Sequence, residues 1–139
     1  EAFERYAGVD PKALSEEEQS YLLATEIEPK LTGEPFYIMT HFPPTQAALA
    51  KVSDRGAERF ELFYNGMELA NGYDELTDPE EHKRRLLEQN RLRAALGKGV
   101  YPETVEPLGP FPDCCGVAVG FDRLLMLKLG VSDIADVLS

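Results

Sequence analysis

Two glutamates on either side of a turn motif are the first residues whose type and spacing suggest chemistry. Asn65-Gly66 favours a two-residue type I′ hairpin, because both turn positions need a positive φ. Counting outward from this turn pairs Phe63 with Glu68, which makes Glu61 and Glu68 diagonal neighbours on one face, about 7–8 Å apart at the backbone. The same register pairs Glu61 with Ala70. Two such carboxylates can bind a hard cation such as Mg²⁺, although both could simply face water.

Three alternating residues after the turn suggest a site for a small amino compound. Asn71, Tyr73 and Glu75 share one face of an extended segment. An amide, an aromatic ring and a carboxylate can together bind a zwitterion or an ammonium group, with a cation–π contribution from the ring. Strict alternation turns this face away from Glu68. A single site therefore requires a bulge or twist near Ala70 to Gly72, where the glycine would tolerate it.

A run of small residues, Gly116 to Gly120, leads into a predicted helix that carries Arg123 in its first turn. Glycine lets a flat ligand approach the backbone, and an arginine near a helix N-terminus can bind a phosphate. The run lacks the glycine spacing of the dinucleotide and P-loop fingerprints. Close packing of helix against strand explains the glycines equally well.

An α+β fold has to position these residues. The sequence predicts an antiparallel sheet flanked by helices, with short helical segments at 45–50 and 131–138 and an irregular, proline-rich connector at 102–112. Alternating and β-branched runs predict the strands, whereas caps such as Ser15, Asp78 and Gly130 predict helix ends. The strands are expected at 36–42, 58–64, 67–73 and 115–119, the last of them buried, and the helices at 15–27, 79–96 and 121–129.

Composition restricts the class of protein further. The 139 residues contain 14 Lys and Arg against 25 Asp and Glu, a net charge of −11, which argues against a protein that coats nucleic acid. No apolar run approaches the roughly 20 residues of a membrane helix and no secretion signal is present, so we expect a soluble cytoplasmic protein. Cys114 and Cys115 are adjacent, and we expect a reduced, buried pair, with a redox or metal role as the alternative.

Three stretches together resemble a known catalytic core. They are Glu58-Arg59-Phe60-Glu61-Leu62-Phe63, then Asn65-Gly66-x-Glu68-x-x-Asn71-Gly72-Tyr73-x-Glu75-Leu76, then Gly116 to Arg123. In this order they resemble the class II lysyl-tRNA synthetases, whose motif 3 matches the last stretch. The resemblance runs from about Phe36 to Ser139. It implies the strand order of the sheet outside the hairpin, and an ATP-dependent activation of lysine.

The resemblance also implies a role for each candidate residue. Positions matching Glu61 and Glu68 hold Mg²⁺ and the ATP phosphates in that family, and Gly120 and Arg123 belong to the ATP-binding motif 3. The lysine pocket of the family matches Asn71 for the substrate carboxylate, Tyr73 for the aliphatic chain and Glu75 for the ε-ammonium group.

Two departures from the usual pattern indicate one branch of the family. Lysyl-tRNA synthetases usually have glycine at the position of Ala118 and a proline within the stretch Gln46 to Ala50. Both features resemble a bacterial branch that attaches β-lysine to a lysine of elongation factor P. One methyl group in a close-packed pocket discriminates by about 1–3 kcal/mol, so Ala118 could favour β-lysine over α-lysine. A lysyl-tRNA synthetase acting on tRNA-Lys and a non-catalytic lysine or nucleotide-binding paralogue stay open.

The resemblance covers only part of the catalytic domain. Segments matching the family's motifs 1 and 2 are not present, so residues 36–139 correspond to the C-terminal half of that domain. Residues 1–35 resemble a helical, peripheral insertion. We therefore expect the 139-residue chain alone to be inactive, and we expect the parent protein to be a homodimer with no membrane contact.

Overall fold

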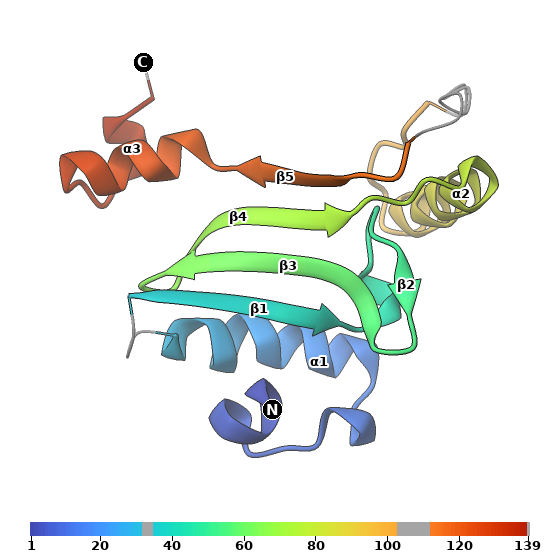
Figure 1. Cartoon of the computed structure of the whole chain (residues 1–139), viewed down its shortest axis with the longest axis horizontal. Coiled ribbons are helices and arrows are strands. Elements are labelled where there is room, and N and C mark those ends of the chain that lie inside the picture. The colour runs from blue at the N-terminus through green and yellow to red at the C-terminus, as the bar shows by residue number, and fades with distance from the viewer. Residues whose placement is uncertain (32–34, 103–111, 139) are drawn as a thin grey trace.

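A five-stranded antiparallel sheet forms the centre of the molecule in a computed structural model that describes residues 1–31, 35–102 and 112–138 (Figure 1). The strand order is β1-β3-β4-β5, and the short β2 pairs with β3. This confirms the predicted sheet and adds β2, where a plain loop was expected. The strands are β1 (Phe36–Phe42), β2 (Val52–Ser53), β3 (Gly56–Tyr64), β4 (Met67–Asp74) and β5 (Cys115–Val119).

Three α-helices and several short helical turns flank the sheet. α1 begins with the predicted capping box, in which Ser15 and Glu18 bond each other's backbone N–H groups. Asp78 is the N-cap of α2, and its carboxylate accepts from the backbone of Glu80 and Glu81. Gly130 ends α3 in the left-handed conformation. The helices are α1 (Glu16–Leu22), α2 (Pro79–Ala95) and α3 (Phe121–Leu129); the turns are Phe3–Ala7, Pro11–Ala13, Leu23–Ile27, Glu28–Lys30, Pro44–Gln46 and Ile134–Asp136.

The hairpin between β3 and β4 has the predicted turn and one irregularity. Asn65 and Gly66 have φ angles of 46° and 77°, as a type I′ turn requires. Next to the turn Phe63 pairs with Glu68, as predicted, but Leu62 then pairs with Ala70. Leu69 therefore has no partner in this ladder and forms a bulge, one residue before the predicted region of Ala70 to Gly72. Beyond it Glu61 pairs with Asn71 and not with Ala70.

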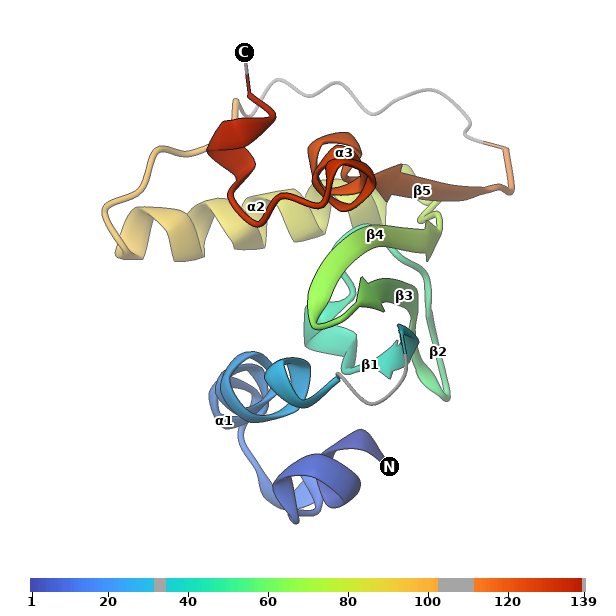
Figure 2. The same ribbon diagram turned by 90° about the vertical axis from the view of Figure 1, so that its left-hand side faces the viewer.

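The helices lie beside the sheet and leave the outer strands β1 and β5 exposed on one face. In both ribbon views the N-terminal helices lie on the β1 side, and α2 and α3 lie toward β5 (Figures 1 and 2). On the face opposite Glu61, Ile38 of β1 and Val117 and Val119 of β5 are 68%, 57% and 51% exposed. The expectation of a buried strand at 115–119 is thus wrong, because β5 is an edge strand that pairs with β4 alone within the described residues.

Three smaller expectations are also corrected. Cys114 and Cys115 are free thiols, as expected, but Cys114 is half-buried and Cys115 is exposed, since they lie where the chain enters the edge strand. Only Ile134–Asp136 forms a helical turn within 131–138. The helical turn expected at 45–50 ends at Gln46. Most of the predicted connector, residues 103–111, lies outside the described residues.

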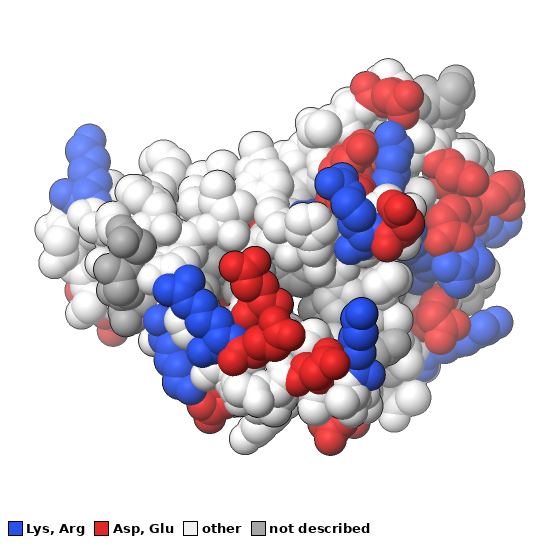
Figure 3. All heavy atoms as spheres, turned by 60° about the horizontal axis from the view of Figure 1, so that its bottom comes forward, with Lys and Arg blue, Asp and Glu red and all other residues white. Residues whose placement is uncertain are grey.

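The core is small and divided. Phe42, Ala47 and Ala57 are buried together with Leu23 and Met39 packed against them, which fixes the N-terminal segment to the β1 side of the sheet. Of the helices that the structure describes, none combines the length and the apolar character needed to cross a bilayer. On the face shown in Figure 3, acidic and basic side chains are intermixed and form no continuous basic stripe.

Candidate functional site

One face of the sheet gathers the residues that the sequence singled out. Directly paired residues of adjacent strands project to the same face. Glu61 pairs with Asn71, which in turn pairs with Ala118 of β5. Glu68 pairs with Phe63, two residues from Glu61, and Tyr73 lies two residues beyond Asn71. The bulge at Leu69 makes this possible, because it brings Glu68 to the face of Asn71 and Tyr73, as the argument from alternation required.

Glu75 extends this face at the far end of β4. Its backbone N–H donates to the carbonyl oxygen of Cys114 at 3.0 Å. A Cβ atom added at Gly116 would overlap the Glu75 carboxylate, so the glycine leaves the space that this side chain occupies. Glu75 also lines a small pocket of about 100 Å³ between the loop at Leu49 and the start of α2. The carboxylate therefore lies at the Gly116 end of the site face.

Arg59 joins Glu61 and Asn71 in one hydrogen-bonded network. Arg59 Nη2 donates to Glu61 Oε1, and Arg59 Nε donates to Asn71 Oδ1 at 3.2 Å. Asn71 Nδ2 donates to the same Glu61 Oε1 at 3.2 Å. The side chains of Arg59 and Glu61 are only 15% and 9% exposed. A buried ion pair of this kind is stabilised when further hydrogen bonds fix both partners, as they do here.

Glu61 is influenced by the negative charges of two further carboxylates, those of Glu68 and Glu28. Burial raises the pKa of Glu61, the Arg59 guanidinium opposes this rise, and the negative charges of Glu68 and Glu28 add to it. Burial and the charge of Glu68 also raise the pKa of Glu28, which belongs to the N-terminal segment. Glu28 thus contributes a charge to the site from outside the sheet. An added cation between these groups would be electrostatically favourable.

Arg123 and Gly120 lie at the other end of the face, where β5 leads into α3. Arg123 Nη1 donates to the backbone oxygen of Glu68 at 2.6 Å and lies 3.7 Å from its Oε2. Gly120 donates its backbone N–H to the carbonyl oxygen of Leu69 at 2.8 Å. The bulge residue is therefore bonded to the start of α3, so that the arginine stays next to Glu68.

The carboxylates fit a magnesium ion that arrives with a nucleotide. Mg²⁺ usually keeps several waters and binds one or two carboxylates together with phosphate oxygens. Glu61 and Glu68 supply two such carboxylates on one face. The described part of the chain holds no cluster of three or more His, Cys, Asp or Glu side chains able to bind a metal. The described residues therefore do not support a metal site made of protein ligands alone. They are compatible with a Mg²⁺ ion that is bound by two carboxylates and by phosphate oxygens of a nucleotide.

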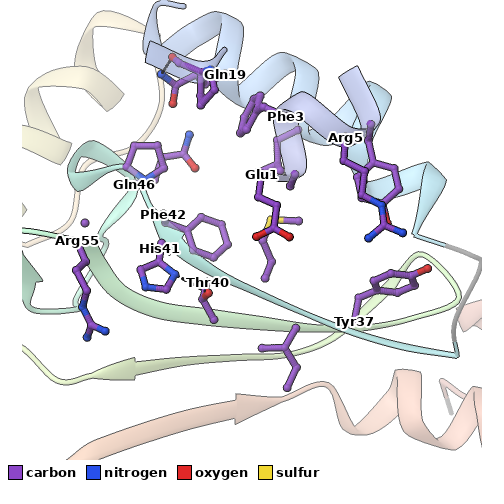
Figure 4. Close-up of a pocket in the computed structure, with 18 of the residues that line it drawn as sticks. Glu1, Phe3, Arg5, Gln19, Tyr37, Thr40, His41, Phe42, Gln46 and Arg55 are labelled. Carbon is purple, nitrogen blue, oxygen red and sulfur yellow. Dashed lines mark hydrogen bonds between the residues drawn. The ribbon is translucent and has the colours of Figure 1, made fainter. Parts of the chain in front are cut away.

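The sequence prediction missed two residues of this site. Arg59 alternates with Glu61 and Phe63 along β3, so its spacing alone could have placed it on the site face. Glu28 had no such signal, because only tertiary packing brings it near Glu68. A cavity of about 760 Å³ lies elsewhere, between the N-terminal segment and β1, where Phe3, Tyr37 and His41 line it (Figure 4). None of the predicted site residues lines this cavity.

Comparison with known proteins gives a consistent result. Residues 4–139 match the sequence profile of the class II tRNA synthetases (D, K and N). An elongation factor P–(R)-β-lysine ligase from Salmonella gallinarum is 46% identical over 125 residues, which cover 85% of this chain and 38% of that protein. The ligases of the same name from Histophilus somni and Photorhabdus laumondii are 44% and 45% identical. The chain therefore spans about two fifths of the length of these curated relatives.

Proposed function

The chain belongs to the class II tRNA synthetase family (D, K and N), and from this membership we propose that its full-length protein activates β-lysine with ATP and transfers it to a lysine of elongation factor P. The observation that carries the proposal is the placement of Glu61, Glu68, Asn71 and Ala118 on one face of the sheet. The relatives named as β-lysine ligases support this acceptor, and Ala118 supports this substrate.

The first step forms an aminoacyl-adenylate. A carboxylate oxygen of the amino acid attacks the α-phosphorus of ATP, the bond from that phosphorus to the α,β-bridging oxygen breaks, and pyrophosphate leaves with the electron pair. Glu61 and Glu68 would hold Mg²⁺, which when bound neutralises charge on the phosphates. Arg123 lies beside Glu68, where it can bind a phosphate oxygen. Such a reaction requires positioning and charge neutralisation, and no nucleophilic side chain of the protein.

The amino acid would lie along β4. Asn71 binds its carboxylate, the Tyr73 ring packs along its aliphatic chain, and Glu75 pairs with its terminal ammonium group. Glu75 is half-buried at the Gly116 end of the strand, four residues beyond Asn71, and its carboxylate would select a positively charged side chain there. In the second step the acceptor lysine, after its ammonium group has lost a proton to solvent, attacks the carbonyl carbon of the adenylate. The bond from that carbon to the phosphate oxygen breaks, AMP leaves with the electron pair, and the new amide nitrogen loses a second proton to solvent.

ATP–pyrophosphate exchange by the full-length gene product tests the proposal. We expect faster exchange with β-lysine than with α-lysine, and none without an amino acid. The activated product should then be incubated with elongation factor P or with tRNA-Lys, and mass spectrometry should find the added mass on the factor. Exchange with neither amino acid would contradict the proposal. The full-length product is used because we propose that the 139-residue chain lacks part of the catalytic domain.

A lysyl-tRNA synthetase is the second candidate, favoured by the breadth of the matching profile, which includes the tRNA synthetases themselves. Preference for α-lysine together with charging of tRNA-Lys would establish it.

A further inference from the structure

The side-chain amide of Asn71 has only one orientation compatible with its two neighbours. Arginine carries donors only, and an ionised carboxylate carries acceptors only. The atom of Asn71 that faces Arg59 Nε must therefore be oxygen, and the atom that faces Glu61 Oε1 must be nitrogen. One hydrogen of Nδ2 is used by Glu61, and the second has no acceptor among the described residues, so it can donate to a ligand.

Arg59 is itself held rigidly. Its Nη1 donates to the backbone oxygen of Gln46 at 2.8 Å. Its guanidinium carbon lies 4.4 Å from the ring centre of Phe42 and 5.9 Å from that of Tyr73. Two rings and a backbone carbonyl thus fix the plane of the guanidinium, and cation–π attraction is strongest in such a desolvated setting. Each of its three donor nitrogens has a different partner.

Glu61 depends on the same group. Within the described residues both hydrogen bonds to this carboxylate end on Oε1, from Arg59 and from Asn71. The structure describes no fully buried side-chain nitrogen or oxygen that lacks a partner. Because Oε2 has no partner among the described residues, it is not fully buried. Arg59 therefore turns one oxygen inward and leaves the other for a ligand.

We propose that Arg59 is a positioning residue that orients the Asn71 amide toward the amino-acid carboxylate and the Glu61 Oε2 toward the metal-bound nucleotide. This rests on the proposed function for the identity of the two ligands. Arg59 links the amino-acid side of the site, which contains Asn71, to the nucleotide side, which contains Glu61, because one guanidinium group fixes both residues. A single lysine ammonium group could keep the charge but could not make three bonds in a fixed plane.

Kinetics of the full-length gene product test this role. Loss of a charge-assisted hydrogen bond network weakens binding by about tenfold or more, so Arg59→Gln should raise KM for the amino acid and the half-saturating Mg²⁺ concentration by that factor. Arg59→Lys should recover the thermal stability but not these two constants. Arg91→Gln, which removes an arginine whose side chain is 78% exposed and paired with Glu88 on α2, should change neither. Full recovery of both constants by Arg59→Lys would overturn the proposal.

A double-mutant cycle separates positioning from general stability. If Arg59 acts through Asn71, Arg59→Gln should have little further effect on the amino-acid KM in an Asn71→Ala background. Equal effects in both backgrounds would show that Arg59 does not act through Asn71, and would overturn the proposal.

Nuclear magnetic resonance keeps this inference apart from the proposed function. In the unliganded protein the Asn71 Nδ2 hydrogen bonded to Glu61 should exchange slowly with water, and this protection should be lost in Arg59→Gln but kept in Arg91→Gln. Suppose that neither amino acid supports pyrophosphate exchange but the amide protection follows this pattern. That result would contradict the proposed function and support the role of Arg59. Equal protection in Arg59→Gln would contradict the role of Arg59 whatever the activity.

Discussion

A methyl group is the chemical difference that we expect to select the substrate. Ala118 pairs with Asn71, the residue proposed to bind the substrate carboxylate, so we expect its side chain to lie beside the α-amino group of a bound lysine. Replacing Ala118 with Gly should lower the ratio of β-lysine to α-lysine activation by about tenfold or more, since one methyl group is worth about 1–3 kcal/mol. Pyrophosphate exchange with each isomer measures the ratio.

Val117→Ala is the matched control for this prediction. Val117 is the adjacent residue of the same strand and projects to the opposite face, so its truncation should leave the ratio unchanged. An unchanged ratio of β-lysine to α-lysine activation in Ala118→Gly would show that Ala118 does not determine the substrate preference.

Gly116 gives a second prediction at the scale of the residue. Its missing Cβ leaves the space for the Glu75 carboxylate, so Gly116→Ala should displace that carboxylate. We expect KM for the amino acid to rise by about tenfold, as when a charged hydrogen bond is lost, while KM for ATP stays unchanged. Gly99→Ala, at a position with no atom within 4 Å of the added carbon, is the control. Equal rises in both KM values would indicate a general disturbance of β5.

The elements of the sheet were largely predictable, and the reasons are local. The turn at Asn65-Gly66, the strand Phe36–Phe42 and the caps Ser15 and Asp78 are each specified by a few adjacent residues, and the structure has all of them where expected. The sequence could predict that β4 contains a bulge, but it could not predict that the bulge lies at Leu69. Its exact position depends on contacts with β5 and α3, such as the bond from Gly120 to the Leu69 carbonyl, which no local pattern encodes.

The positions of residues in the candidate site were likewise predictable where they depend on local sequence and unpredictable where they depend on tertiary packing. Alternation along β3 could place Arg59 and Glu61 on one face, because the period of a strand is a local property. Asn71 reaches that face only through the bulge at Leu69. Glu28 could not be placed, because its effect on Glu61 arises from packing of a segment distant in sequence. The exposure of Cys115 and of the whole of β5 was mispredicted for the same reason, since an apolar run does not show whether a second layer covers it.

The first turn of α2 carries a pH-dependent contribution to stability. Hydrogen bonds from Arg84 and Arg85 lower the pKa of Glu81 from 4.5 to about 2. Because the folded pKa is the lower one, the stabilisation is complete above about pH 4.5 and is lost as the pH falls toward 2. Arg85 also donates to the carbonyl oxygens of Ala48 and Ala50, so this cluster attaches α2 to the loop before β2.

Glu81→Gln should therefore be less stable than the wild type near neutral pH, and the difference should vanish as the pH falls from about 4.5 to about 2. Denaturant unfolding measured across this range gives the comparison. Glu80→Gln changes an exposed neighbour in the same turn and should give a much smaller difference. A difference between wild type and Glu81→Gln that is constant with pH would contradict the assignment.

At the scale of the whole molecule, the exposed face of β1 and β5 predicts self-association of the isolated 139-residue chain. Ile38, Val117 and Val119 present exposed apolar side chains on β1 and β5, whose outer edges have no partner strand within the described ranges. This arrangement favours edge pairing and aggregation. The curated relatives are longer than this chain, and in them further residues are available to cover the corresponding face. The division at residue 35 and a homodimeric full-length protein stay predictions.

Replacing both Val117 and Val119 with Lys should shift the isolated chain toward the monomer in light scattering, because charges on an edge strand oppose pairing. Leu96→Lys, which places the same charge at an exposed apolar residue at the end of α2, should have little effect. Association that is equally strong in all three proteins would show that another surface is responsible.

The bulge at Leu69 also has a consequence for how this segment can change in evolution. Every side chain from Ala70 to Glu75 owes its orientation to the one residue that the register skips. Replacing Leu69 alters packing but preserves that orientation, whereas deleting or inserting one residue would turn Asn71, Tyr73 and Glu75 to the opposite face at once. Homologues that keep the chemistry should therefore keep Asn71 and Tyr73 and the length of the stretch from Glu68 to Glu75, while the other positions between them vary.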